Sequence, residues 1–297
     1  MITIPSLSTN PAINLAIEEY VLNNKKEGEY LMLWISEPSV IIGKFQNPYL
    51  EVCPGACERD KIGLYRRNSG GGTVYHDYGN LNYTIIGDKG DSSPDYERFL
   101  RPVTEFLKTL SVDAEIRDTS AVFANGLKLS GNAQSVVGGR IMHHGTLLFD
   151  SSLDKLNRYT GKPRKTVSSK SIQSNPSPVG NIRPMLKEDM SIDDFASRLN
   201  SYLSDGEYVF SAEETEIISS IAKEKYETWE WNYGKTTSFE IDSDGFTLRA
   251  KNGITEYSSE FSDILTGRRL EYNEIKKLLC SSADEQKAAR ILNIIFG

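Results

Sequence analysis

The chain has 297 residues, more than one average domain, with 38% hydrophobic residues and a net charge of −7. The acidic balance lacks the clustered basic face that binding to a phosphate backbone needs, so we exclude nucleic acid as a partner. No apolar run of about 18 residues occurs and no signal-peptide pattern opens the chain, so we expect a cytoplasmic protein that neither spans a membrane nor is secreted.

The first element is predicted to be an amphipathic helix that begins at Asn10 and Pro11. Asn is a favoured N-cap and Pro suits the first helical position, and apolar residues then recur at helical spacing as far as Val21. Strands are expected at residues 30–35, 40–44, 62–67, 73–76 and 81–86, which are rich in β-branched and aromatic residues.

Three consecutive glycines, Gly70, Gly71 and Gly72, lie between two of these strands. Without a Cβ, such a backbone can adopt positive φ angles and bring its N–H groups close to a bulky anion. Arg66 and Arg67, just before the run, would then pair with phosphate oxygens. A simple hairpin turn is the alternative interpretation. The segment matches neither the nucleoside-triphosphatase loop nor the dinucleotide fingerprint, so phosphate binding here requires another architecture.

A helix is expected near residues 95–110, with a kink or a new start at Pro102. After it, NGLKLSGNAQ places Lys128 in a short strand that leads into a turn at Ser130 and Gly131. An ammonium at that place would stabilise negative charge, as when a carboxylate attacks an α-phosphate. The alternative is a solvated lysine at the end of a strand.

The segment RIMHHGTLLFD predicts a further strand, with His143, His144 and Gly145 at its entrance. Residues 162–184 lack periodicity and predict a long loop with short ordered pieces beside the site. Its basic residues would meet an acidic carrier domain or simply form a solvated loop; they are Lys162, Arg164, Lys165 and Lys170.

Helices are expected at 191–203 and 212–226, and the remainder reads as a smaller α+β unit with strands in SFEID and FTLRA. The aromatic residues of WEWNYGK are expected to pack at the junction of the two units. The chain has three cysteines, Cys53, Cys57 and Cys280. An odd number argues against a disulfide framework. CPGAC lacks the second pair of ligands that a zinc site needs.

Together these segments resemble the lipoate–protein ligase A family, in the superfamily of lipoate ligases, octanoyltransferases and biotin ligases. The resemblance runs through NPAINLAIEEYVL, IIGKFQNPYLEV, RRNSGGGTVYHDYGNLNYT, GLKLSGNAQ, HHGTLLFD and SSKSIQSNPSPVGNI, and it resumes at WEWNYGKTTSFE. It implies an α+β fold of mixed sheets with packed helices, in which residues 1–230 form the catalytic domain and residues 236–297 a small accessory domain.

The resemblance implies an ATP-dependent ligase that converts lipoate to lipoyl-AMP, releases pyrophosphate and transfers the lipoyl group to a carrier lysine. Lys128 matches the lysine of the family's K-x-S-G motif and is the expected catalytic residue. The implied ATP and adenylate contacts are Arg67, Gly72, Thr73, Val74, Tyr75 and Lys128. The implied lipoate contacts are Ser69, Gly70, Gly71, His76, Asn80, Lys128, His144 and Gly145.

One departure from the family concerns its Arg-Asn-Asp triplet, where this chain reads Arg117, Asp118, Thr119 and Ser120. Asp118 is the expected metal ligand after a register shift. Because of this departure, an ATP-independent lipoyl or octanoyl transferase stays open as an alternative, as does a non-catalytic binding protein. An amidotransferase with a cysteine nucleophile is disfavoured, since no cysteine follows Lys128 near the HHG segment. Biotin is disfavoured because the GRGR-type loop is absent.

The resemblance further implies ATP and lipoate as substrates and Mg2+ as the cation that bridges phosphate oxygens. The implied partners are the apo lipoyl domains of 2-oxoacid dehydrogenase E2 subunits and the glycine cleavage H protein, and we expect a monomer. Lipoate and octanoate are not separated at this stage, because a hydrophobic tunnel discriminates weakly between apolar chains of similar length.

Overall fold

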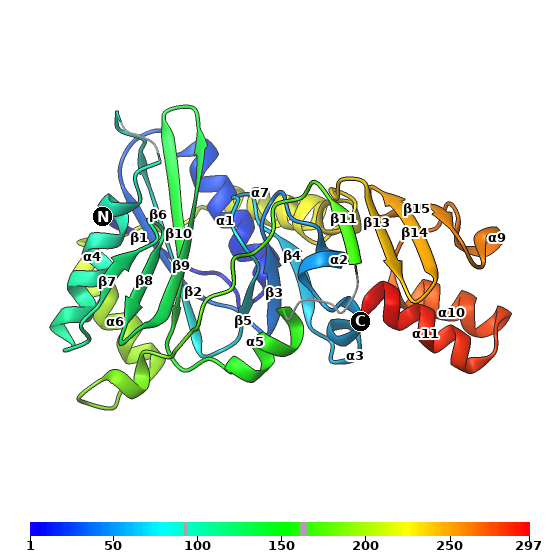
Figure 1. Cartoon of the computed structure of the whole chain (residues 1–297). Helices are drawn as coiled ribbons and strands as arrows, with labels where there is room; N and C mark the ends of the chain where they lie inside the picture. Colours follow the sequence, from blue (N-terminus) through cyan, green and yellow to red (C-terminus); the bar gives the residue numbers. More distant parts are fainter. Residues whose placement is uncertain (92–93, 161–165) are drawn as a thin grey trace.

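The computed structural model describes residues 1–91, 94–160 and 166–297. It has a larger N-terminal unit built on an extended sheet and a smaller C-terminal unit beside it (Figure 1). The chain ends where the two units meet, next to the helix α3 (Pro54–Arg59). The α+β class that the sequence predicts is confirmed.

In the described part of the chain, the largest sheet has eight strands. They are β1 (Ile2–Ile4), β2 (Tyr30–Ile35), β6 (Asn80–Asp88), β7 (Glu115–Arg117), β8 (Ala121–Ala124), β9 (Leu127–Val137), β10 (Arg140–Leu148) and β12 (Gly206–Glu207). The spatial order is β12-β1-β2-β6-β10-β9-β8-β7. The strands from β2 to β7 in this order pair antiparallel, whereas β1 runs parallel to both of its neighbours.

Helices cover both faces of this sheet. Successive strand residues point to opposite faces, and Leu31 accordingly packs with α4 (Tyr96–Thr109) and α6 (Ile192–Leu203). Its neighbour Met32 packs on the other face, which is covered by α1 (Pro11–Asn24), α7 (Ala212–Ile221) and the π-helical turn η2 (Ala222–Tyr226). As predicted, Asn10 caps α1, where its side chain accepts a hydrogen bond from the N–H of Ala12 at 2.8 Å.

A second, three-stranded sheet lies between the large sheet and the C-terminal unit (Figure 1). Its order is β4 (Gly63–Arg66), β3 (Ser39–Ile42), β5 (Val74–His76). The helices α2 (Pro48–Glu51), α3 and α5 (Leu153–Thr160) lie near it, and Val40, Ile42 and Tyr75 belong to a core cluster shared with α3 and α5. The glycine run connects β4 to β5, so it leaves one edge of this sheet and returns to the other.

The C-terminal unit consists of a four-stranded sheet and short helices. The order is β11 (Thr166–Ser169), β13 (Phe239–Ser243), β14 (Phe246–Lys251), β15 (Ile254–Ser258). The helices are α8 (Trp229–Asn232) at the junction, then α9 (Ser262–Leu265), α10 (Tyr272–Ser282) and α11 (Glu285–Phe296). Two contributions come from far earlier in the chain: β11 pairs with β13, and Tyr49 is part of this unit's core.

Two sequence-based expectations about strands are wrong. Lys128 does not lie in a short strand that ends in a turn, because β9 continues through Ser130 and Gly131 to Val137. His143, His144 and Gly145 do not mark the entrance of their strand either; they lie inside β10, which pairs on both sides. Small residues resemble turn residues in sequence, but here they accommodate neighbouring side chains within a continuous sheet.

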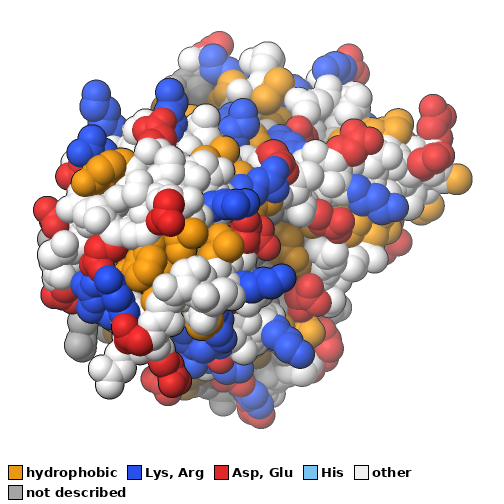
Figure 2. Space-filling view, turned by 90° about the vertical axis from the view of Figure 1, so that its right-hand side faces the viewer, with side chains coloured by type: hydrophobic (Ala, Val, Ile, Leu, Met, Phe, Trp, Pro, Cys, Tyr) orange, Lys and Arg blue, Asp and Glu red, His pale blue; other side chains and the backbone are white. Residues whose placement is uncertain are grey.

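Pro102 does not start a new helix, since α4 runs through it from Tyr96 to Thr109. The long loop predicted at 162–184 contains β11 and a 3-10 turn, η1 (Arg183–Met185). Lys162, Arg164 and Lys165, expected to meet a carrier domain, lie outside the described residues. Figure 2 shows Lys and Arg side chains interspersed with Asp and Glu on the side of the C-terminal unit. Among the described helices, none has the length and apolar character required to cross a membrane.

Candidate active site

A cavity of about 300 Å³ lies between the glycine loop (residues 68–73), the large sheet and residues 174–177. Its floor is a row of residues that crosses four neighbouring strands. Trp34 on β2 pairs with Asn82 on β6, and Asn82 pairs with Thr146 on β10. The N–H of Gly131 on β9 donates to Thr146 Oγ1 at 3.3 Å, which extends the row to a fourth strand. Because neighbouring strands lie about 4.8 Å apart, the row is roughly 14 Å long.

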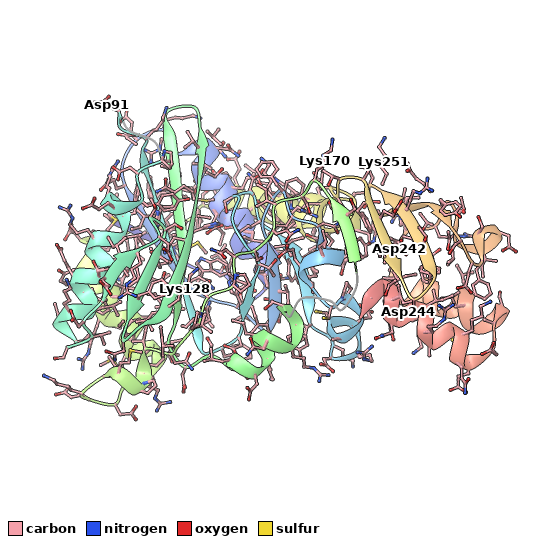
Figure 3. The ribbon with its side chains drawn as sticks, viewed as in Figure 1. Asp91, Lys128, Lys170, Asp242, Asp244 and Lys251 are labelled. Atoms are coloured by element: carbon pink, nitrogen blue, oxygen red, sulfur yellow. The ribbon has the colours of Figure 1, made fainter. Side chains whose placement is uncertain are left out.

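The ammonium of Lys128 lies at the β9 end of this row. A Cβ built on Gly131 would be 3.2 Å from Lys128 Cε and 3.3 Å from Nζ, so the ammonium lies directly over this glycine. Burial lowers the pKa of Lys128, and the nearby carboxylate of Asp118 partly opposes that shift. Figure 3 labels Lys128 beside the strands of the large sheet. The side chain is therefore a half-buried cation that faces the cavity and not a solvated lysine.

Residues 171–180, which we call the strap, cross the glycine loop from the C-terminal sheet to Lys128. The N–H of Thr73 donates to Ser174 Oγ at 2.9 Å, and the hydroxyl of Ser174 donates to the buried carboxylate of Glu51 at 2.5 Å. Further along, the N–H of Lys128 donates to the carbonyl of Pro178 at 2.9 Å, and the N–H of Gly180 donates to the carbonyl of Lys128 at 3.1 Å. The strap thus fixes both the glycine loop and the backbone of the lysine.

Arg67 braces the glycine loop from inside. Its Nη2 donates to the carbonyls of Gly70 at 2.5 Å and Gly72 at 2.8 Å, and its Nε donates to Ser69 Oγ at 3.1 Å. Nη1 donates to the carbonyl of Ile41 at 3.3 Å. Burial lowers the pKa of this guanidinium to about 10. A guanidinium has five N–H donors, and four of them hold the protein itself, which leaves one for a ligand.

Ser69 is anchored by a buried chain of hydrogen bonds to the first helix. Its Oγ lies 2.6 Å from His144 Nε2, and His144 Nδ1 lies 3.0 Å from Glu18 Oε1. Nδ1 thus faces the Glu18 carboxylate, and Nε2 faces the hydroxyl of Ser69. Both ring nitrogens of His144 are therefore engaged, and His144 offers the cavity its ring surface.

His76 also lines the cavity, but neither of its ring nitrogens has a hydrogen-bond partner in the described part of the chain. The side chain is 3% exposed and packs edge-on against Trp34, with ring centroids 5.6 Å apart. Burial, with the positive charge of Arg67 and the neighbouring His144, lowers the pKa of His76 to about 3. This histidine is neutral near pH 7.

The sequence-based expectation that Arg66 binds phosphate is wrong. Its side chain is fully buried and does not line the cavity. It donates to Thr236 Oγ1 and to five backbone carbonyls, those of Gly43, Lys44, Gln46, Trp231 and Asn232. Burial lowers its pKa to about 10. Paired arginines look equivalent in sequence, but adjacent strand residues face opposite sides, and only Arg67 faces the site.

Asp118 lines the cavity from the hairpin turn between β7 and β8. Asp118 and Thr119 both have positive φ angles, of 50° and 66°. Asp118 is the one carboxylate among the described lining residues, and the described residues contain no group of three His, Cys, Asp or Glu side chains that could hold a metal by themselves. A Mg2+ ion bound through one carboxylate and substrate phosphates is compatible with this donor set.

The structure brings most of the predicted site residues to the cavity. Those that line it are Arg67, Gly71, Gly72, Thr73, Val74, His76, Asp118, Lys128, His144 and Gly145. Four others do not: Ser69 and Gly70 accept hydrogen bonds from Arg67, and Tyr75 packs on Tyr159 in a separate core. Asn80 supports the lining residue Asn82, donating to its Oδ1 at 3.0 Å.

Sequence reasoning missed several lining residues: Leu15, Trp34, Ile41, Asn82, Ser120, Ala121, Gly131, Asn132, Ala133, Thr146, Ser174, Asn175 and Ser177. One signal was available for Asn82. Asn80, Asn82 and Thr84 alternate with apolar residues along a buried strand, and polar side chains on one face of such a strand indicate a site. Trp34 gave no such signal, because its strand is apolar throughout.

Comparison with known proteins identifies the family of the chain. Residues 10–204 match the family model of the lipoyl protein ligase A/B catalytic domain. The chain is similar to lipoate-protein ligase LplJ of Bacillus subtilis, at 36% identity over 294 residues, 93% of this chain and 88% of that protein. It is similar to a putative lipoate protein ligase from T. acidophilum with bound lipoic acid, at 25% identity with a TM-score of 0.65, over 78% of this chain and 98% of that one. A lipoate-protein ligase A bound with ATP is similar at 26% identity with a TM-score of 0.65, over 79% and 100% of the two chains. The chain therefore belongs to the lipoate–protein ligase family.

Proposed function

We propose that this protein is an ATP-dependent lipoate–protein ligase. The observation that carries the proposal is the placement of Lys128 Nζ at one end of the roughly 14 Å row, with Trp34 and His76 at the other end. An extended medium-chain acid fits along this row with its carboxylate at the ammonium. The relatives solved with lipoic acid and with ATP support the choice of substrates.

In the first half-reaction, a lipoate carboxylate oxygen attacks the α-phosphorus of ATP, and the bond to pyrophosphate breaks. Lys128 would hold the carboxylate and stabilise the charge that develops on the phosphoryl oxygens. The glycine loop would bring backbone N–H groups close to the nucleotide, in the shape that Arg67 maintains. Mg2+ would neutralise phosphate charge when bound, with Asp118 as its protein ligand.

In the second half-reaction, the amine of an acceptor lysine attacks the acyl carbon of lipoyl-AMP, an amide forms and AMP leaves. Lys128 would remain beside the acyl carbonyl and stabilise its developing negative charge. We propose that the acceptors are lipoyl domains of E2 subunits and the H protein, and that the enzyme acts in the cytoplasm. We further propose that it is a monomer with two domains. Residues 1–230 form the catalytic domain and residues 236–297 the accessory domain. Lys170, directly after β11, lies on the outer surface (Figure 3) and is available to an acidic acceptor.

A second candidate function is favoured by one observation. The turn at Asp118 and Thr119 replaces the Arg-Asn-Asp triplet of the resembled family. Without the nucleotide contacts of that triplet, the chain would act only on preactivated acyl groups.

The two functions are separated by the intact mass of an apo lipoyl domain after incubation with the protein, lipoate and Mg2+. The ligase predicts a lipoyl-sized increase only when ATP is present, and no increase with Lys128→Ala. Modification by synthetic lipoyl-AMP but not by lipoate with ATP would instead establish the transferase. No modification under either condition would reject both.

A further inference from the structure

The protein contains three histidines, all buried, and they differ in their hydrogen bonding. His143 Nδ1 lies 3.0 Å from Gln134 Nε2, and both nitrogens of His144 have partners. His76 alone has two nitrogens without a partner in the described part of the chain. Buried polar atoms are nearly always hydrogen-bonded, so an exception in the wall of a cavity indicates a ligand group.

The place of His76 specifies which part of the ligand it would meet. It packs against Trp34, at the β2 end of the cavity floor, whereas Lys128 lies at the β9 end. If the carboxylate lies at Lys128, the far end of the acyl chain reaches His76. Other lining groups near Trp34 already have partners: His144 bonds Ser69 and Glu18, Trp34 Nε1 donates to Thr84 Oγ1 at 3.2 Å, and Asn82 Nδ2 donates to the carbonyl of Trp34 at 3.3 Å.

We propose that His76 is a specificity residue that donates its ring N–H to a sulfur of the lipoyl dithiolane and so favours lipoate over octanoate. This inference rests on the proposed function, since it assumes that the acyl chain lies along the floor. A neutral imidazole has one N–H donor and one acceptor nitrogen, and a ring sulfur is a weak acceptor. Octanoate has the same chain length without sulfur, so it leaves the donor of this buried side chain unpaired. The acceptor nitrogen is unpaired with either acid and does not discriminate.

The test is the ratio of affinities for free lipoate and free octanoate, measured by calorimetry without ATP in the wild type and in His76→Leu. The wild type should prefer lipoate, and His76→Leu should lower this preference about three- to tenfold, the range of one hydrogen bond. His76→Gln, which retains an N–H donor, should recover part of it. Val209→Ala, at an exposed residue that does not line the cavity, should leave the ratio unchanged.

His76→Leu is expected to fold, since it replaces an unpaired buried polar group with an apolar one, and its thermal melting is checked first. An unchanged ratio in His76→Leu, or equal ratios in His76→Leu and His76→Gln, would overturn the inference. So would a wild type that binds neither acid. The proposed function fails differently: lipoate would bind with the expected ratios, yet no carrier domain would be modified when ATP is present.

Discussion

At the scale of single residues, the position of the Lys128 ammonium depends on the absence of a side chain at Gly131. We predict that Gly131→Ala displaces the ammonium, because the new Cβ would lie 3.3 Å from Nζ, tighter than ordinary contact. The free energy of unfolding should change by less than about 1 kcal/mol, since only the end of a flexible side chain must move. Lipoyl-AMP formation should fall by about tenfold or more, the effect of misplacing a charge that stabilises the transition state.

The matched control is Gly139→Ala, at a glycine of the β9–β10 turn where a new Cβ meets no atom within 4 Å. Pyrophosphate release and urea unfolding are measured for both variants. Equal activity of the two would show that the Lys128 position is not critical. Equal destabilisation would show that the loss at Gly131 is a folding effect.

The buried histidines make stability depend on pH. Burial lowers the pKa of both His76 and His143 to about 3, against an ordinary value of 6.5. Since the folded-state pKa is depressed, the unfolded chain binds protons first as pH falls, and the stability that is present above pH 6.5 is lost toward pH 3. We predict that the free energy of unfolding falls by about 3 kcal/mol between pH 6.5 and pH 5 for the two histidines together.

Urea unfolding across this pH range measures how steeply the free energy of unfolding changes with pH. His76→Leu should roughly halve this slope. Glu214 also affects stability. Burial raises the pKa of its carboxyl, but hydrogen bonds to Lys25 and other partners outweigh burial and lower the pKa to about 2. The stability that Glu214 contributes is therefore lost mainly below pH 4.5. It therefore stays outside the window. A slope near zero in the wild type would mean that the histidines titrate normally.

At the scale of elements, Arg66 joins the loop after β3 to the junction before the C-terminal unit. Arg66→Met would remove the guanidinium donors from five backbone carbonyls, of which that of Gly43 still accepts from the N–H of Gln46, and we predict a loss of about 4 kcal/mol or more in the free energy of unfolding. Arg66→Lys should recover little, because an ammonium has only three donors. The exposed Arg59→Met serves as control and should stay within about 0.5 kcal/mol. A stable Arg66→Met protein that had only lost ATP affinity would restore the phosphate-binding interpretation.

The turn between β7 and β8 carries local strain. Other hairpin turns pair a positive-φ residue with glycine, as in Asn125–Gly126 and Asn252–Gly253, whereas Thr119 is β-branched with φ of 66°. We predict that Thr119→Gly raises the free energy of unfolding by about 1 kcal/mol, because the strain of a left-handed side chain exceeds the entropy that glycine loses on folding. Thermal melting measures the change. A lower melting temperature would mean that the Thr119 side chain makes a stabilising contact.

Some of these elements could be predicted from the sequence, and others could not. The strands β2 to β6 and the cap of α1 could be predicted, because their signals are local: period, β-branched residues, an Asn-Pro start. The family motifs led to Lys128, the glycine loop and His76. Arg66, Ser174 and the cross-strand floor could not be predicted, since their partners are 15 to 170 positions away in sequence and become neighbours only through sheet order. Local patterns specify elements, whereas the site depends on how strands are paired.

At the scale of the whole molecule, the two units share structure across the boundary between them. β11 and Tyr49 belong by sequence to the first unit but complete the sheet and the core of the second. The strap continues from β11 to the glycine loop and Lys128. Any displacement of the C-terminal sheet would therefore pull on the segment that holds the catalytic lysine's backbone, which links the position of the small unit to the site.

Tyr49 offers the sharpest test of this arrangement. It is fully buried, its ring stacks on Phe239 with centroids 5.2 Å apart, and its hydroxyl donates to the carbonyl of Leu270 at 2.7 Å. We predict that Tyr49→Ala destabilises the protein by about 3 to 5 kcal/mol and makes the C-terminal unit the first part to be cleaved in limited proteolysis. Tyr49→Phe, which keeps the ring and loses one hydrogen bond, should lose only about 1 kcal/mol. If Tyr49→Ala lost stability without faster cleavage near the junction, the two units would unfold as one, and the small unit could not move independently of the strap.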